Sequence, residues 1–159
     1  MIRIDVKSML SRALESAREQ IQRNLADTGT NASGKTSQSL VVSVTDTNGE
    51  LSGRFAFGTV ETGRRAGKVP SGFRQIIYQW MQDKGVHADI TGRRSQESAD
   101  RSMAYLIARK IAREGSKLYR EGGREDIYSN VLPLTIEQVQ RELTNVYIIN
   151  INSIMTWQQ

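Results

Sequence analysis

Apolar side chains recur every three or four residues near the start of the chain and form a stripe along residues 6–25. The positions that share this spacing are Leu10, Leu14, Ala17, Ile21 and Leu25. A period close to that of the α-helix puts such positions on one face and leaves the charged residues between them on the other. The pattern therefore predicts an amphipathic helix over residues 6–25.

The next part of the chain changes to a pattern typical of β-structure. Residues 40–44 are rich in valine, and residues 51–57 alternate in part between apolar and polar side chains. Between them, Asn48 and Gly49 form a dipeptide that favours a type I′ turn. We expect a β-hairpin here, preceded by a polar loop over about residues 26–36 that has room for one helical turn.

Helical spacing returns twice in the second half of the chain. The first run predicts a short, buried helix that ends at Lys84 and Gly85, with apolar positions at Phe73, Ile76, Ile77, Trp80 and Met81. The second run predicts a long helix that ends at Gly122 and Gly123, with apolar positions at Met103, Leu106, Ile107, Ile111 and Leu118. Two basic loops, over residues 61–72 and 86–96, flank the shorter helix.

The C-terminal part predicts one more helix after Pro133 and then a strand over residues 147–154, because that segment is rich in isoleucine. The strand is apolar on both faces, with Ile149 and Ile151 on one of them. It is expected to join the sheet of the hairpin or to pair with a sheet edge of a neighbouring molecule. The predicted fold class is α+β: a small sheet of the hairpin and the C-terminal strand, packed with the N-terminal helix and two or three further helices.

Length and composition fit one domain over residues 1–159, with mobile loops at about 26–36, 61–72 and 86–96. Hydrophobic residues make up 38% of the chain, which is enough for a core. The absence of cysteine excludes disulfides and thiolate metal sites. No stretch approaches the roughly 20 apolar residues of a membrane span, and the N-terminus does not resemble a signal peptide. We therefore expect a protein that is neither exported by that route nor inserted in a membrane.

The sharpest motif lies at residues 29–36, where Gly29, Gly34, Lys35 and Thr36 satisfy the G-x-x-x-x-G-K-[ST] pattern of a phosphate-binding loop. That loop requires a buried strand before it and a helix after it, so that backbone N–H groups converge on the phosphates. Here an amphipathic helix is predicted before the motif and a strand soon after it. A nucleotide-hydrolysing enzyme is therefore a minor alternative, which ATP turnover lost in Lys35→Ala would support.

Other catalytic patterns are weak. His87 is the only histidine, so no second imidazole or thiolate can complete a zinc site or a Cys–His pair. Most carboxylates lie on the predicted outer faces of helices, where paired acid–base catalysis is not expected. We predict no catalytic residue, no metal and no cofactor, and a protein that is not an enzyme.

The basic residues are more informative, because the chain carries a net charge of +5 and much of it gathers in two loops. Arg64, Arg65, Lys68 and Arg74 surround the first loop, and Arg93 and Arg94 occupy the second. The loops could contact acidic protein neighbours or the phosphates of nucleic acid, without aromatic residues interleaved for base stacking. The alternative interpretation, an ordinary basic surface without a specific partner, is equally consistent with the sequence.

Several blocks, in their order along the chain, resemble the tail-completion and neck proteins that join the head and tail of tailed bacteriophages. Residues 32–40 resemble the small-Gly-basic-small segment that leads into the first strand of that family. Residues 55–64, with Gly58, Thr59, Glu61 and Gly63, are similar to its aromatic-x-x-Gly-Thr-x-x-Glu-x-Gly stretch. Residues 70–85 and 104–115 look like its next two helices. The chain lacks the Pro-Phe-rich turn that many relatives carry before the last helix.

The resemblance implies a structural virion protein that forms a homo-oligomeric ring of six or twelve copies in the neck or tail, with DNA passing through the lumen. Its partners would be further copies, the portal or an adaptor, and tail proteins, with non-specific contact to DNA, and it would assemble in the cytoplasm of the bacterial host. The expected interface residues are Arg64, Arg65, Lys68, Arg93, Arg94, Ile149 and Ile151. The alternative is a small basic nucleic-acid-binding module, which would bind DNA with a steep salt dependence and form no ring.

Overall fold

The computed structural model describes the backbone of residues 5–90 and 92–156 and the side chains of these residues except Phe55 and 149–156. Its backbone contacts divide the chain into two compact units. Unit 1 contains residues 1–28, 37–54 and 125–159, and unit 2 contains residues 29–36 and 55–124. Both helices and a small sheet are present, so the predicted α+β class is confirmed. That the two units form one domain stays a prediction.

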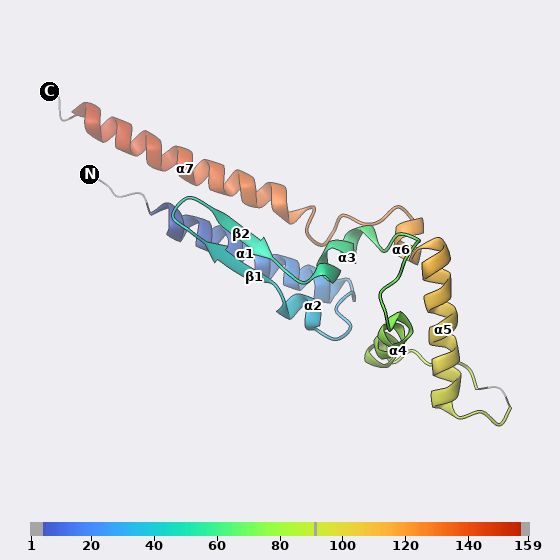
Figure 1. The fold of residues 1–159 in the computed structure, drawn as a ribbon. Helices are drawn as coiled ribbons and strands as arrows, with labels where there is room; N and C mark the ends of the chain where they lie inside the picture. The colour runs from blue at the N-terminus through green and yellow to red at the C-terminus, as the bar shows by residue number, and fades with distance from the viewer. Residues whose placement is uncertain (1–4, 91, 157–159) are drawn as a thin grey trace. The chain divides into compact units, whose positions relative to one another are not determined.

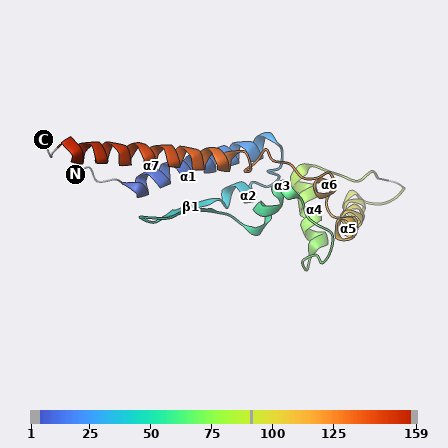
Figure 2. The ribbon, with the colours of Figure 1, turned by 90° about the horizontal axis from the view of Figure 1, so that it is seen from above.

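Unit 1 is built around α1 (Val6–Asp27), which confirms the predicted N-terminal helix. Asp5 caps the helix, because its side chain accepts a hydrogen bond from the Ser8 backbone N–H at 2.9 Å. The most buried residues of α1 lie at helical spacing: Met9, Ala13, Ala17, Ile21 and Leu25. The helix contacts both the hairpin and the last helix of the chain, and Figure 1 and Figure 2 show it alongside both. Because it contacts both the hairpin and the last helix, α1 is the centre of this unit.

The predicted hairpin is present as β1 (Val41–Val44) and β2 (Gly49–Ser52), which pair antiparallel. Its turn differs from the prediction: Val44 pairs with Gly49, so residues 45–48 form the turn and Gly49 belongs to the strand. No described non-glycine residue has a positive φ, which a type I′ turn at Asn48 and Gly49 would require. A Cβ at position 49 would lie 2.6 Å from Leu14 Cδ1 of α1, so the Leu14 side chain would have to move to accommodate it.

The second strand is also shorter than predicted. Residues 55–57, expected to be extended, belong to a 3₁₀ helix, η1 (Phe55–Gly58), and α3 (Thr59–Thr62) follows it directly. Before the hairpin, the predicted helical turn in the polar loop is present as α2 (Lys35–Gln38).

The C-terminal strand predicted over residues 147–154 is wrong, because that segment lies inside α7 (Val131–Thr156). The sheet in the described residues therefore consists of the hairpin alone. Val131, Val139 and Val146 are buried or half-buried along the helix, and α7 packs against α1. The preference of β-branched residues for strands amounts to only about 1 kcal/mol, and the helix that begins at Val131 continues through this segment. Pro133 is tolerated because it lies in the first turn, where no intrahelical N–H bond is needed.

Unit 2 packs α4 (Phe73–Lys84) against α5 (Gln96–Glu114). Ile77, Met81, Ala104 and Ala108 form the buried centre of this pair. The small alanines allow the two helices to approach closely. Gly85 ends α4 in a left-handed conformation, as predicted.

The predicted long helix is divided. The helix α5 ends at Glu114, and a separate short helix, α6 (Lys117–Arg120), follows. Gly115 makes the break, because its φ is 84° and a Cβ on it would lie 2.9 Å from the Arg64 carbonyl oxygen. In the described residues, no helix is both long and apolar enough to span a membrane.

Candidate functional site: the basic face of α4 and α5

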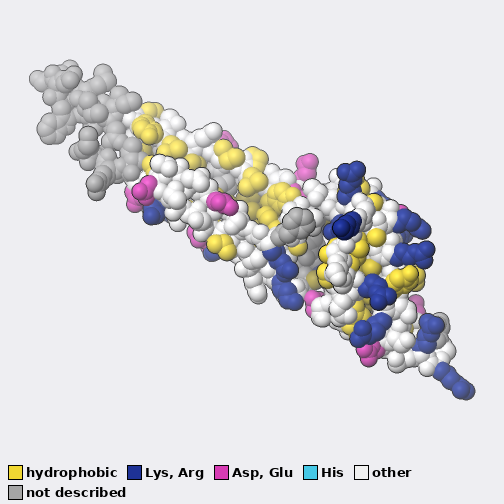
Figure 3. Space-filling model, viewed as in Figure 1, with side chains coloured by type: hydrophobic (Ala, Val, Ile, Leu, Met, Phe, Trp, Pro, Cys, Tyr) yellow, Lys and Arg dark blue, Asp and Glu magenta, His cyan; other side chains and the backbone are white. Residues whose placement is uncertain are grey.

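The positive charge of the protein belongs to unit 2. Of the 22 Lys and Arg residues in the chain, 15 lie in unit 2, together with 7 of the 17 Asp and Glu residues, which gives unit 2 a net charge of +8. Unit 1 holds the other 7 basic and 10 acidic residues and has a net charge of −3. Figure 3 shows dark blue side chains gathered on unit 2. Any interaction driven by positive charge is therefore expected at unit 2.

The first basic loop is anchored to the residues that follow α5. The Arg64 backbone N–H donates to Ser116 Oγ at 2.9 Å, and the Ser116 N–H donates to the Arg64 carbonyl at 2.8 Å. The Arg64 guanidinium lies over the Phe73 ring, 5.2 Å from its centroid, and donates to the Lys68 carbonyl at 2.8 Å. Arg64 is thus half-buried and holds the loop in place, whereas Arg65 and Lys68 are exposed.

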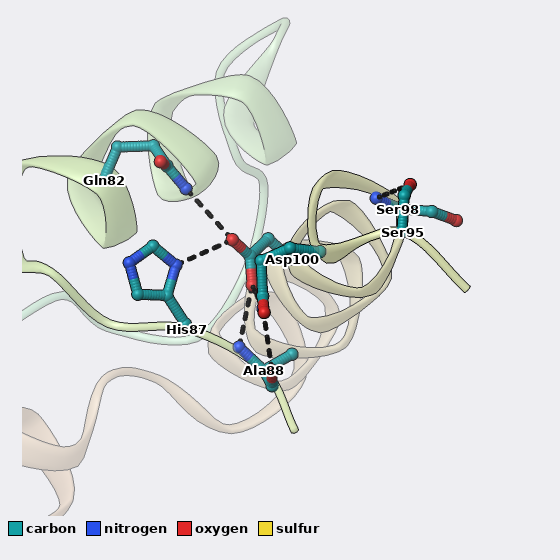
Figure 4. A network of polar contacts seen from close by, with 7 residues as sticks. Gln82, His87, Ala88, Ser95, Ser98 and Asp100 are labelled. Carbon is teal, nitrogen blue, oxygen red and sulfur yellow. Dashed lines mark hydrogen bonds and ion pairs between the residues drawn. The ribbon is translucent and has the colours of Figure 1, made fainter. Parts of the chain in front are cut away.

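The second basic loop is anchored through the buried carboxylate of Asp100 (Figure 4). Asp100 Oδ1 accepts hydrogen bonds from the Ala88 N–H at 2.7 Å and from Gln96 Nε2 at 2.9 Å. Asp100 Oδ2 lies 2.9 Å from His87 Nδ1 and 3.3 Å from Gln82 Nε2. The bonds from Ala88, His87 and Gln96 hold the pKa of Asp100 well below its usual value, against the opposing effect of burial. His87 is exposed in the loop, and its ring is tethered to Asp100.

The two basic loops lie at opposite ends of α5, so they do not form one surface. Gly67 of the first loop donates its N–H to the carbonyl of Ala112, close to the C-terminal end of the helix. The second loop is attached at Asp100, near the N-terminal end. Arg93 and Arg94 are exposed and form no ion pair within the described part of the chain. The surface between the two loops is supplied by the helices themselves.

That intervening surface carries two crossed arginine–tyrosine pairs. Arg74 of α4 lies over the ring of Tyr105 of α5, 5.5 Å from its centroid. Arg101 of α5 lies over the ring of Tyr78 of α4, 4.8 Å from its centroid. Each helix thus presents an arginine to the tyrosine of the other, and cation–π attraction holds the flat guanidinium groups against the rings.

The sequence reasoning missed this surface, although a signal was present. Both helices contain Arg-x-x-x-Tyr, at residues 74–78 and 101–105, and this spacing places the two side chains of each motif on one helical face. Only the packing of α4 against α5 brings the motifs together. Aromatic rings accompany the basic residues both on these helices and at the first loop, where Arg64 lies over Phe73.

Shallow grooves run beside the crossed pairs. Two of them share Arg74 and Tyr105, which separate a groove toward the start of α5 from one toward Pro70 and Arg109. The first groove also contains serine hydroxyls, at Ser95, Ser98 and Ser102. These open grooves are suited to an extended partner lying on the surface.

The phosphate-loop motif does not have the flanks that phosphate binding requires. The helix α1 ends at Asp27 just before Gly29, and the motif is followed by the four residues of α2 and then by β1. Lys35 is exposed at the start of that short helix. The Lys84 ammonium donates a hydrogen bond to the Gly29 carbonyl oxygen, so this part of the motif contacts α4. The arrangement matches the flanks predicted from the sequence.

The remaining expected site residues are at the C-terminus. Ile149 and Ile151 lie in the helical backbone of α7, and their side chains are outside the described residues. Because the segment is helical, it cannot add to a neighbouring sheet as the predicted strand would. Among the described residues there is also no cluster of His, Asp and Glu able to hold a metal ion.

Comparisons with known proteins identify no relative. No protein-family model matches the chain, and neither the curated proteins nor the solved structures that were compared contain a match.

Proposed function

We propose that this protein is a structural virion component without catalytic activity, which forms a homo-oligomeric ring at the head–tail connection of a tailed bacteriophage. The observation that carries the proposal is the exposure of large apolar side chains on helices of both units. On α7, Leu134 is 66% exposed and Ile136 is 58% exposed. On α5, Leu106 is 61% exposed. Such side chains are costly to leave in water and favour assembly with further chains.

The charge of the two units supports contacts between copies. A net charge of +8 on unit 2 and −3 on unit 1 favours a contact between unit 2 of one copy and unit 1 of the next. A contact between two different surfaces is heterologous, and it closes a ring when the rotation between neighbouring copies divides a full turn. Exposed Arg65, Lys68, Arg93 and Arg94 are the basic residues that we assign to this contact or to docking on the portal.

The resemblance to neck and tail-completion proteins is the reason for placing the protein at the head–tail connection. The residues that carry it fall in α2, in the η1–α3 segment, in α4 and in the second half of α5. A protein in this position would meet further copies, the portal or an adaptor, and tail proteins, while DNA passes through the ring.

The mass of the protein in solution tests the proposal. Light scattering over a range of concentrations and salt, with and without a portal ring, should detect a closed oligomer or recruitment to the portal. Leu134→Ser with Ile136→Ser should reduce the mass while leaving the helical content unchanged, because both side chains are already exposed. Gln138→Ser with Gln140→Ser is the matched control on the same helix.

A monomer at every concentration that also fails to bind the portal would refute the proposal. If that monomer binds DNA with a steep salt dependence, the protein is a nucleic-acid-binding module.

A further inference from the structure

We propose that the face formed by α4 and α5 binds the phosphate backbone of nucleic acid without reading its sequence. The surface belongs entirely to unit 2 and does not require a ring. It is distinct from the two basic loops, which lie at either end of it.

The basic residues of α5 form a regular row. Arg101, Tyr105, Arg109 and Arg113 follow one another at intervals of four residues, and all four are exposed. Four residues of helix rise about 6 Å, so the row extends over about 18 Å. Arg74 joins it from α4 through its contact with Tyr105. With Arg74 beside Tyr105, positive groups follow the whole length of the row, which fits a polymeric anion better than the scattered carboxylates of a folded protein.

The crossed pairs prepare two of the arginines for binding. A guanidinium group placed over an aromatic ring loses less side-chain entropy when a ligand binds. Arg74 and Arg101 are both placed in this way, and Arg101 also donates through Nε and Nη2 to Glu97 Oε1. Arginine also forms paired hydrogen bonds with phosphate oxygens, which lysine cannot do.

Neighbouring carboxylates neutralise only part of this charge. Glu97 bonds to Arg101 at 2.8 Å, and Glu114 is paired with Arg113. Arg74 and Arg109 form no ion pair within the described residues. The surface therefore has two arginines without an ion pair, Arg74 and Arg109, and two that are each paired with their own glutamate, Arg101 with Glu97 and Arg113 with Glu114.

The two tyrosine rings of this face do not provide an open platform on which bases could stack. Tyr78 is half-buried, and the rings of both Tyr78 and Tyr105 have an arginine over one face. Recognition by base stacking is therefore secondary to contact with phosphates. Double- and single-stranded DNA both carry a phosphate backbone. A comparison of their binding affinities determines which of them fits the row of arginines.

Fluorescence anisotropy with a labelled DNA duplex and a single strand of the same length, over a range of salt concentrations, tests the inference. One triple variant removes three arginines from the proposed face: Arg74→Gln, Arg101→Gln and Arg109→Gln. The matched control removes three exposed arginines from unit 1 helices: Arg12→Gln, Arg23→Gln and Arg141→Gln. Both lose three positive charges, so they differ only in where the charge is lost.

The wild-type protein should bind with an affinity that falls steeply with salt. The first triple variant should reduce the slope of log K against log salt by about 2, since each lost phosphate contact removes nearly one released counterion and Arg101 is already paired with Glu97. The control should retain the wild-type slope. Arg109→Gln alone, at a residue without an ion pair or aromatic contact, should reduce the slope by about 1 without disturbing the fold.

Three results would overturn the inference: no binding by the wild type, equal losses in the two triple variants, or equally tight binding to poly-glutamate. The last would indicate an acidic protein partner. Light scattering on the same variants separates this inference from the ring, because loss of DNA binding at unchanged mass supports the phosphate surface whether or not a ring forms.

Discussion

At the scale of single residues, Asp100 has the largest structural role in unit 2. Its side chain accepts from α4 at Gln82, from the following loop at Ala88 and from Gln96 at the start of its own helix. A buried carboxylate is stable only when its oxygens are satisfied, and here four groups satisfy them. Asp100 therefore holds the start of the second basic loop to the α4–α5 pair.

Replacing Asp100 by Asn should flatten the dependence of stability on pH in acid. The pKa of Asp100 in the folded protein lies below its ordinary value of 3.8, so the unfolded chain binds more protons as the pH falls. The stabilising effect of the carboxylate is complete above about pH 5 and is lost progressively as the pH falls toward the folded-state pKa. Urea unfolding at neutral and acidic pH measures this difference.

Asp89→Asn is the control for this experiment, because it removes the same charge from an exposed position in the same loop. If D100N and the wild type lose stability in parallel as the pH falls, Asp100 does not hold the loop.

At the scale of elements, α7 shows how packing overrides local preference. Its last third is rich in isoleucine and asparagine, yet the backbone stays helical to Thr156. In α5 the helix is shorter than its apolar spacing predicts. That spacing continues past Glu114, whereas Gly115 ends the helix. A contact accompanies each outcome. The helix α1 packs on α7, and the Arg64 carbonyl oxygen lies close to Gly115 at the end of α5.

Asn150→Pro tests the helical assignment of the C-terminal segment. Proline inside a helix removes a backbone hydrogen bond and costs roughly 3 kcal/mol, whereas an edge strand can accommodate it. The variant should lose helical signal in far-UV circular dichroism relative to Asn150→Ala. Equal helical content in the two variants would show that the segment is not helical in solution.

At the scale of the whole molecule, the question is whether the two units unfold together. The size and composition of the chain predict a single domain, so their unfolding transitions should coincide. With Trp157→Phe, Trp80 becomes the only tryptophan and its fluorescence reports on unit 2, while circular dichroism reports on the helices of both units.

Coincident transitions in urea would confirm one cooperative domain. Two separate midpoints would mean that unit 2 folds independently, and the α4–α5 face could then be studied by itself.

The sequence alone determined the elements whose signals are local. The spacing of apolar residues predicted α1 and α4, Gly85 marked the end of α4, and the valines of residues 40–44 predicted the hairpin. These features depend on side-chain periodicity and on backbone preferences within a few residues, both of which can be recognised in the sequence itself.

The tertiary structure decided the features that depend on contacts between distant residues. The isoleucine-rich pattern of residues 147–154 did not distinguish a strand from the end of a long helix, and the close approach of the Arg64 carbonyl to Gly115 goes with the end of α5. The crossed pairs of Arg74 with Tyr105 and of Arg101 with Tyr78 exist only because α4 packs on α5. Local preferences of about 1 kcal/mol cannot specify such arrangements, since burial and packing between elements contribute more.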